Sequence, residues 1–330
     1  MSGVTTNPAI FSAAIRKSDD YDSQIMELAG QPVNSIYEAL ITTDVRSACD
    51  ILRPVYDRTD GRDGFVSLEV SPHLARNTQG SIDEARRFWK AVARPNLFIK
   101  IPGTLEGVPA IEELLVEGIN VNITLLFSIE RYEAVALAYV RALERREMQK
   151  TPLQGIVSVA SFFLSRIDTL VDALLQEKIR GGSSDAKRLL GESAIANARL
   201  AYLRFKVMIS SERWHSLQSA GAHPQRLLWA STSAKNPSYD DLMYVEPLIG
   251  PQTINTLPRK TIATFAERGK PALSLDRGFE EARQVMSELE KAGIDFHRVT
   301  QQLLDEAIRK FVEPFDELLK AIAEREKASR

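Results

Sequence analysis

Short apolar runs that suit buried strands alternate with helical patterns along most of this chain of 330 residues. This alternation is typical of βα units, which build a parallel sheet covered by helices. Seven strand-like runs can be recognised, near Val4, Val66, Phe98, Ile123, Val157, Leu228 and Ile254. A closed barrel of alternating strands and helices needs eight strands. The pattern therefore predicts an α/β fold, either an open sheet or a (β/α)8 TIM-type barrel that lacks its first strand.

The helical patterns between these runs give local expectations. Residues 9–29 are expected to form one helix, and residues 239–245 a short helix. The region from residue 176 to residue 220 is helical and polar, and so is the region from residue 278 onward. Pro314 lies inside the last helical pattern, where it is expected to kink or restart the helix, because proline lacks the backbone N–H.

Composition excludes several classes of protein. The formal net charge is −2, so no strong field favours nucleic acid or an anionic membrane surface. No apolar stretch approaches the length of a membrane span, and the first residues lack the pattern of a signal peptide. Cys49 is the only cysteine, and the four histidines share no metal-ligand spacing. We therefore expect a cytoplasmic protein without a metal site.

A lysine interrupts one of the apolar strands. Lys100 lies in the run from Leu97 to Ile101, which ends at Pro102-Gly103. Burying an ammonium group without a partner costs free energy, so two interpretations arise from this run. In one, Lys100 is near the strand end and its amine extends to water. In the other, burial lowers its pKa and leaves a neutral amine that attacks a carbonyl to form a Schiff base.

Polar residues recur near the carboxyl ends of the predicted strands. In a parallel barrel these ends share one face, where active sites lie. Each residue alone would be an ordinary turn residue, but together they predict a polar mouth that favours the nucleophile interpretation of the lysine. The residues are Asn7, Glu69, Lys100, Asn122, Thr124, Ser161, Ser231 and Asn255.

The chemistry of these side chains suggests separate roles. Lys100 would be the nucleophile, and Glu69 the group that moves protons, because a dry pocket tunes a carboxylate toward neutral pH. Thr124 would hold a water molecule between them. No cofactor is needed for this chemistry.

Further residues would bind the substrate. The side-chain amides of Asn7 and Asn122 are suited to sugar hydroxyls. Arg166 and Lys235, just beyond two strand ends, are suited to a phosphate group, although each could equally be a solvated surface charge.

Several motifs, taken in order, resemble the transaldolase family, specifically its long bacterial form among the Schiff-base aldolases. The resemblance covers about residues 3–273. The motifs are residues 3–11, 66–70, 98–104, 120–127, 158–166, 229–236, 244–250 and 253–258.

The resemblance implies a (β/α)8 barrel and a reaction. The enzymes of this family move a dihydroxyacetone unit from sedoheptulose 7-phosphate to glyceraldehyde 3-phosphate, giving erythrose 4-phosphate and fructose 6-phosphate. This is a step of the non-oxidative pentose phosphate pathway. The substrates are sugar phosphates, and we expect this chain to act as a monomer or homodimer. The resemblance also implies a single domain over residues 1–330, with a helical insertion at 176–220 and C-terminal helices at 278–330.

The resemblance also assigns roles to individual residues. Lys100 matches the Schiff-base lysine, and Glu69 and Thr124 match an acid/base pair that acts through a water molecule. The other matches are to substrate-binding positions, namely Asn7, Asn122, Ser161, Arg166 and Lys235. Ser161 and Arg166 fall on phosphate-binding positions. Many members have arginine where this chain has Lys235, which keeps the charge but loses the two-pronged geometry.

One departure concerns the first strand of the family, which carries an aspartate that acts in proton transfer. This chain starts near the family's second strand, and no residue matches the aspartate. We therefore expect weak or absent turnover from the 330 residues alone. Two alternatives to the transaldolase hypothesis follow. One is a fructose-6-phosphate aldolase, which releases free dihydroxyacetone, and the other is an inactive sugar-phosphate binding protein.

Overall fold

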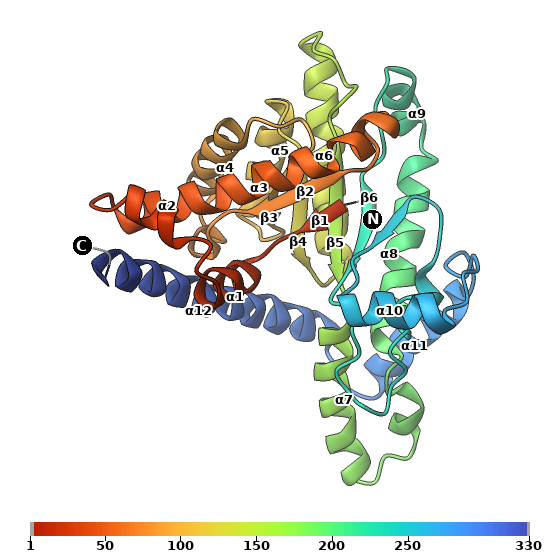
Figure 1. Ribbon diagram of the computed structural model, residues 1–330. Helices are drawn as coiled ribbons and strands as arrows, with labels where there is room; N and C mark the ends of the chain where they lie inside the picture. Colours follow the sequence, from red (N-terminus) through yellow and green to blue (C-terminus); the bar gives the residue numbers. More distant parts are fainter. Residues whose placement is uncertain (1–2, 329–330) are drawn as a thin grey trace. The chain divides into compact units, whose positions relative to one another are not determined.

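A computed structural model describes residues 3–328 of the chain (Figure 1). The described residues form two compact units. Unit 1 comprises residues 3–122 and 306–328, and unit 2 comprises residues 123–305. The boundaries between the units fall within a strand, after Asn122, and within the last helix, after Asp305.

Unit 1 alternates strands and helices. Its elements are β1 (Gly3–Thr5), α1 (Pro8–Lys17), α2 (Asp22–Glu27), α3 (Val33–Arg58), β2 (Phe65–Glu69), the 3-10 helix η1 (Pro72–Leu74), α4 (Thr78–Val92), β3 (Leu97–Pro102), α5 (Gly107–Val116), the start of β4 (Val121–Leu126) and the larger part of α12 (Phe296–Ala328). The strands lie in chain order, and β1–β2 and β2–β3 are parallel. The N–H of Ile99 in β3 donates to the carbonyl of Asn120, just before β4.

Burial explains why β2 and β3 consist mostly of apolar residues. Every residue of β2 and of β3 is buried. Helix α3 packs on β2, and α4 packs on β3 and α5 (Figure 1). A parallel strand that is covered by helices needs apolar side chains on both faces, so a polar side chain in these strands must find a partner inside the protein.

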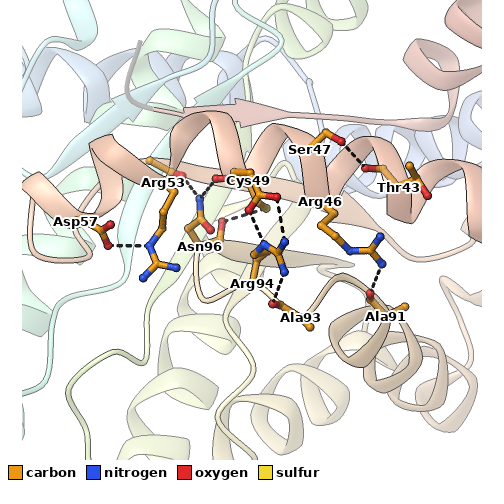
Figure 2. A network of polar contacts seen from close by, with 12 residues as sticks. Thr43, Arg46, Ser47, Cys49, Arg53, Asp57, Ala91, Ala93, Arg94 and Asn96 are labelled. Carbon is orange, nitrogen blue, oxygen red and sulfur yellow. Dashed lines mark hydrogen bonds and ion pairs between the residues drawn. The ribbon is translucent and has the colours of Figure 1, made fainter. Parts of the chain in front are cut away.

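Asn96 fixes the register of β2 and β3. Its side-chain Nδ2 donates to the carbonyl of Cys49 in α3 at 2.9 Å (Figure 2). It also donates to the carbonyl of Gly64 at 2.8 Å. Its own carbonyl accepts the N–H of Val66 at 2.9 Å. The amide thus joins α3 to the starts of both strands. The register that follows pairs Glu69 with Lys100 at the other end.

Unit 2 repeats the alternation with longer insertions. Its elements are the rest of β4, α6 (Ile129–Met148), β5 (Ser158–Phe163), α7 (Ser165–Arg180), the 3-10 helix η2 (Asp185–Leu189), α8 (Ser193–Ile209), α9 (Glu212–Ser219), β6 (Arg226–Ala230), the 3-10 helix η3 (Glu246–Leu248), β7 (Thr253–Asn255), α10 (Arg259–Arg268), α11 (Phe279–Lys291) and the start of α12. Strands β5, β6 and β7 lie in chain order and are parallel.

Helix α8 lies at the centre of the helical packing of unit 2. It contacts α6, α7 and α11, and its residues Ala198, Ala201 and Phe205 are buried. Buried Asn197 donates through Nδ2 to the carbonyl of Phe127 at 2.8 Å. The predicted helical character of residues 176–220 is therefore confirmed, and α8 contributes to the core of the unit.

Two local predictions were wrong, and a third was met in part. Residues 9–29 form two helices, α1 and α2, rather than one, because the chain turns between Ser18 and Tyr21. Residues 239–245 form turns rather than a helix, because long-range hydrogen bonds hold this segment (see below). Of the two outcomes expected at Pro314, a kink or a restart, the restart does not occur: α12 continues through Pro314, with Phe315 and Leu318 buried beyond it.

We predict that Asn96→Ala lowers the free energy of unfolding by about 3 kcal/mol, because two buried carbonyls lose their donor. Urea unfolding followed by tryptophan fluorescence measures this. Arg53→Ala, which removes the exposed Arg53–Asp57 ion pair of the same region (Figure 2), is the matched control and should leave the midpoint unchanged. Equal midpoints for Asn96→Ala and the unsubstituted chain would show that Asn96 does not hold the strands.

Candidate active site

Lys100 is buried near the carboxyl end of β3 in unit 1, with only 6% of its surface exposed. Its Nζ lies 2.8 Å from Oε2 of Glu69, the residue that it faces in the parallel register of β2 and β3. Its Nζ also donates to the backbone carbonyl of Thr6 at 3.0 Å. The amine is therefore turned inward, and the interpretation that it extends to water was wrong.

Glu69 has the properties of a proton acceptor for this amine. Its carboxylate is buried, and burial raises its pKa above the ordinary range, while the charge and hydrogen bond of Lys100 act in the opposite direction. A carboxylate that is reluctant to ionise readily takes a proton from a neighbouring group. The direct contact gives a path for that proton without an intervening water.

Two polar groups beside this pair were not singled out from the sequence. The carbonyl of Thr6 accepts from Lys100, and Ser67 lies two residues before Glu69 on β2. Ser67 accepts a hydrogen bond from Nδ2 of Asn122 at 3.0 Å through its Oγ, and one from Oγ1 of Thr6 at 2.7 Å through its carbonyl. The spacing of two residues in a strand could have indicated Ser67, since alternate side chains share a face. The role of the Thr6 carbonyl could not have been predicted, because every residue type has a backbone carbonyl.

Asn7 is the N-cap of α1. Its Oδ1 accepts the N–H of Ile10 at 2.9 Å. Its Nδ2 can donate to a substrate, and its Oδ1 keeps a second lone pair that can accept.

In unit 2, Thr124 is completely buried in β4. Its Oγ1 has no hydrogen-bond partner among the residues that the structure describes. The next residue, Leu125, has φ of 60°, a left-handed conformation that is costly for leucine. A buried hydroxyl without a protein partner and a strained neighbour are both typical of functional positions.

The candidate phosphate-binding residues also lie in unit 2. Ser161 is buried in β5, and Arg166 lies in the first turn of α7, with its guanidinium 5.6 Å from the ring centre of Phe163. Lys235 is exposed in the segment after β6, where its Nζ donates to Oγ of Ser233 at 2.7 Å. Arg166 and Lys235 thus lie on different elements of the unit.

A cluster of two aspartates and two tyrosines holds the segment that carries Lys235. Asp168 and Asp172, both buried, are one turn apart on α7. Asp168 accepts from the hydroxyl of Tyr244 at 2.7 Å, and Asp172 from that of Tyr239 at 2.6 Å. We call these two pairs the tyrosine clasp. They replace the helix that was expected over residues 239–245.

The second oxygen of each aspartate is also occupied. Asp168 accepts the N–H of Ala194 at 2.8 Å, and Asp172 that of Gly191 at 2.9 Å. Burial raises the pKa of Asp168 to about 7, although the bonds from Tyr244 and Ala194 oppose the shift. Burial also raises the pKa of Asp172.

Comparison with known proteins decides the family. The family model described as "Transaldolase/Fructose-6-phosphate aldolase" matches residues 1–322. The chain belongs to this family. The fold class predicted from the sequence, the barrel of this enzyme family, is confirmed.

Named relatives of this transaldolase-family chain are similar over nearly its whole length. A protein of Nostoc sp. named "Transaldolase 2" is 47% identical over 97% of this chain and 87% of its own length. Proteins named "Transaldolase" from Trichodesmium erythraeum and Thermobifida fusca are 46% and 48% identical, each over 98% of this chain and 88% of their own length.

Across residues 3–328 of this transaldolase-family chain, no group of three or more His, Cys, Asp or Glu side chains is arranged to hold a metal ion. None of the helices in that range is both long and apolar enough to cross a membrane.

The buried Asp168 generates a prediction about stability and pH. Its pKa of about 7 in the folded chain exceeds the value of about 3.9 expected after unfolding, so the folded state binds more protons between these pH values. Its contribution to stability is therefore complete below about pH 4 and is lost as pH rises to about 7. We expect Asp168→Asn to remove about 2–3 kcal/mol of the decrease in unfolding free energy between pH 5 and pH 8.

Urea unfolding at pH 5 and pH 8 measures this difference. Replacing the exposed Asp57 by asparagine is the control and should preserve the pH dependence of the unsubstituted chain. An identical pH dependence in Asp168→Asn would contradict the prediction.

Proposed function

We propose that this chain is a transaldolase that transfers a dihydroxyacetone unit through a Schiff base on Lys100. The donor is sedoheptulose 7-phosphate and the acceptor glyceraldehyde 3-phosphate, and the products are erythrose 4-phosphate and fructose 6-phosphate. The observation that carries the proposal is the buried contact of 2.8 Å between Nζ of Lys100 and Oε2 of Glu69. The names of the relatives support the same reaction.

The chemistry begins with the amine. Glu69 accepts a proton from the lysine, and the neutral amine attacks C2 of the ketose. Loss of water gives the imine, which withdraws electrons from the bond between C3 and C4. When that bond breaks, the C4 hydroxyl gives its proton to water and becomes the aldehyde of the departing aldose phosphate, and the three-carbon unit remains on Lys100 as an enamine. The enamine attacks the aldehyde carbon of the acceptor, and water releases the new ketose phosphate.

The remaining roles are assigned by the match of motifs. Thr124 holds the water that acts with Glu69, which is consistent with the unpaired buried hydroxyl of Thr124. Asn7 and Asn122 bind sugar hydroxyls. Ser161, Arg166 and Lys235 bind the phosphate group of both substrates, which needs a serine hydroxyl and cationic side chains.

We also propose a pathway, a cellular compartment and an oligomeric state for the chain. The reaction belongs to the non-oxidative pentose phosphate pathway, and the chain acts in the cytoplasm as a monomer or homodimer. The buried Cys49, which forms no disulfide, is consistent with a reducing compartment.

A second candidate is fructose-6-phosphate aldolase, because the description of the family names both activities. This enzyme would release free dihydroxyacetone in the absence of any acceptor aldose. The three relatives named above favour transfer over release. Assaying dihydroxyacetone with and without an acceptor separates the two reactions.

We predict that Lys100→Met reduces transfer from sedoheptulose 7-phosphate to the background of the assay, because methionine fills the site but cannot form an imine. The measurement is fructose 6-phosphate formation relative to the unsubstituted chain. Substitution of the exposed Lys90 by methionine is the control and should not change the rate. If Lys100→Met keeps the rate of the unsubstituted chain, the proposal fails.

We also predict that Glu69→Gln slows transfer by roughly 10²–10⁴-fold, because the amide still accepts a hydrogen bond from Lys100 but cannot take its proton. Steady-state kinetics with fructose 6-phosphate and erythrose 4-phosphate measure kcat. Glu38→Gln changes a carboxylate that pairs with Arg87 on the helices of unit 1, and it should retain the full rate. A Glu69→Gln variant with unchanged kcat would exclude Glu69 as the proton acceptor.

A further inference from the structure

The segment that carries Lys235 is attached to α7 at three points. Ser165, Asp168 and Asp172 occupy positions i, i+3 and i+7 of α7, which share one face of a helix. Their partners follow β6: Oγ of Ser165 lies 2.9 Å from Oγ of Ser231, and the clasp adds Tyr239 and Tyr244. We call residues 231–246 the cation loop, because it carries Lys235.

We propose that Asp168 and Asp172 are positioning residues for phosphate binding, because they hold the cation loop against the helix whose first turn carries Arg166. The inference rests on the proposed function, which assigns Arg166 and Lys235 to the phosphate group of the substrate. It adds a role for four side chains that do not touch substrate, namely the two aspartates, Tyr239 and Tyr244.

The spacing of the attachment points supports this role. Lys235 is four residues from Ser231 and four from Tyr239, both of which are bonded to α7. Four residues of extended chain span at most about 14 Å, so the two attachments confine the backbone of Lys235 to the neighbourhood of α7. The loop forms no regular secondary structure between β6 and η3, so its own hydrogen bonds do not confine the lysine in the same way.

The bonds of the clasp restrict the cation loop to one position. The second oxygen of each aspartate accepts a backbone N–H, from Ala194 or Gly191, which orients the carboxylate toward its tyrosine. A tyrosine hydroxyl bonded to a buried carboxylate makes a stronger bond than one between neutral groups. Gly191 also allows the close approach of Tyr239, since an added Cβ would lie 2.9 Å from Cζ of that ring.

Other contacts of the cation loop lie on either side of the segment that carries Lys235. Arg268 of α10 forms two hydrogen bonds of 3.0 Å with Asp240. This ion pair is exposed, and exposed pairs contribute little to stability. It also lies beyond Tyr239 along the chain, and on the other side Oγ1 of the buried Thr232 donates to the carbonyl of Thr256. Without the clasp, the stretch between Thr232 and Asp240, which carries Lys235, would lose its bond to α7.

The test compares Tyr239→Phe, Tyr244→Phe and the double variant with the unsubstituted chain. Each change removes one hydroxyl and keeps the ring. Tyr202→Phe is the matched control, because the hydroxyl of Tyr202 bonds to the carbonyl of Pro251, outside the cation loop. Isothermal titration calorimetry with inorganic phosphate as the probe measures binding at the site without any turnover.

We expect the double variant to bind inorganic phosphate about tenfold more weakly, as it would if the loop were in place for only a tenth of the time. Tyr202→Phe should bind as the unsubstituted chain does. The value of kcat/KM for glyceraldehyde 3-phosphate should fall by the same factor, whereas that for unphosphorylated glyceraldehyde should not change. This difference between the two acceptors would not arise from a general loss of structure.

Three results would overturn the proposal: unchanged phosphate affinity in the folded double variant, an equal loss for both acceptors, or no phosphate binding by the unsubstituted chain. Tyr239→Phe alone provides the test if the double variant does not fold, since Tyr239 is only partly buried. Phosphate binding that depends on the clasp, in a chain without transfer activity, would count against the proposed function and not against the clasp.

Discussion

The buried pair of Lys100 and Glu69 is the interaction on which the proposed chemistry depends. Burying an amine and a carboxylate is costly unless each is bonded to the other and to further partners. The carbonyl of Thr6 supplies one such partner, and the parallel register of β2 and β3 supplies the alignment. Because Asn96 sets that register from the opposite end of the strands, a structural amide determines the geometry of the reactive amine.

The sequence predicted the reactive pair better than its surroundings. Lys100 and Glu69 were recognisable because a charged side chain inside an apolar strand demands an explanation, and alternation of strands and helices placed both at the same edge. The contacts of Asp168 and Asp172 were not predictable, since each joins residues about 70 positions apart in the sequence. The same bonds explain why the helical pattern of residues 239–245 was misleading, because tertiary hydrogen bonds overrode a local preference.

The two units therefore carry different parts of the proposed chemistry. Unit 1 contains the amine, its proton acceptor and the amide of Asn122 beside Ser67. Unit 2 contains Thr124, Ser161, Arg166 and Lys235. The tyrosine clasp holds the cation loop, which carries Lys235. In each unit, a lysine that is proposed to bind substrate, Lys100 or Lys235, is positioned by buried polar groups. Those groups themselves are not proposed to contact substrate. Such supporting groups are needed because a small displacement of a reacting or binding group is costly to catalysis.

The most direct measurement of the central claim is a peptide mass map of the chain after reduction with borohydride in the presence of fructose 6-phosphate. Reduction converts an imine into a stable amine, so the sugar remains attached to the residue that formed it. The account predicts one modified peptide, with the added mass on Lys100. Addition of the mass to another lysine, or no addition in a folded chain that catalyses the transfer, would contradict it.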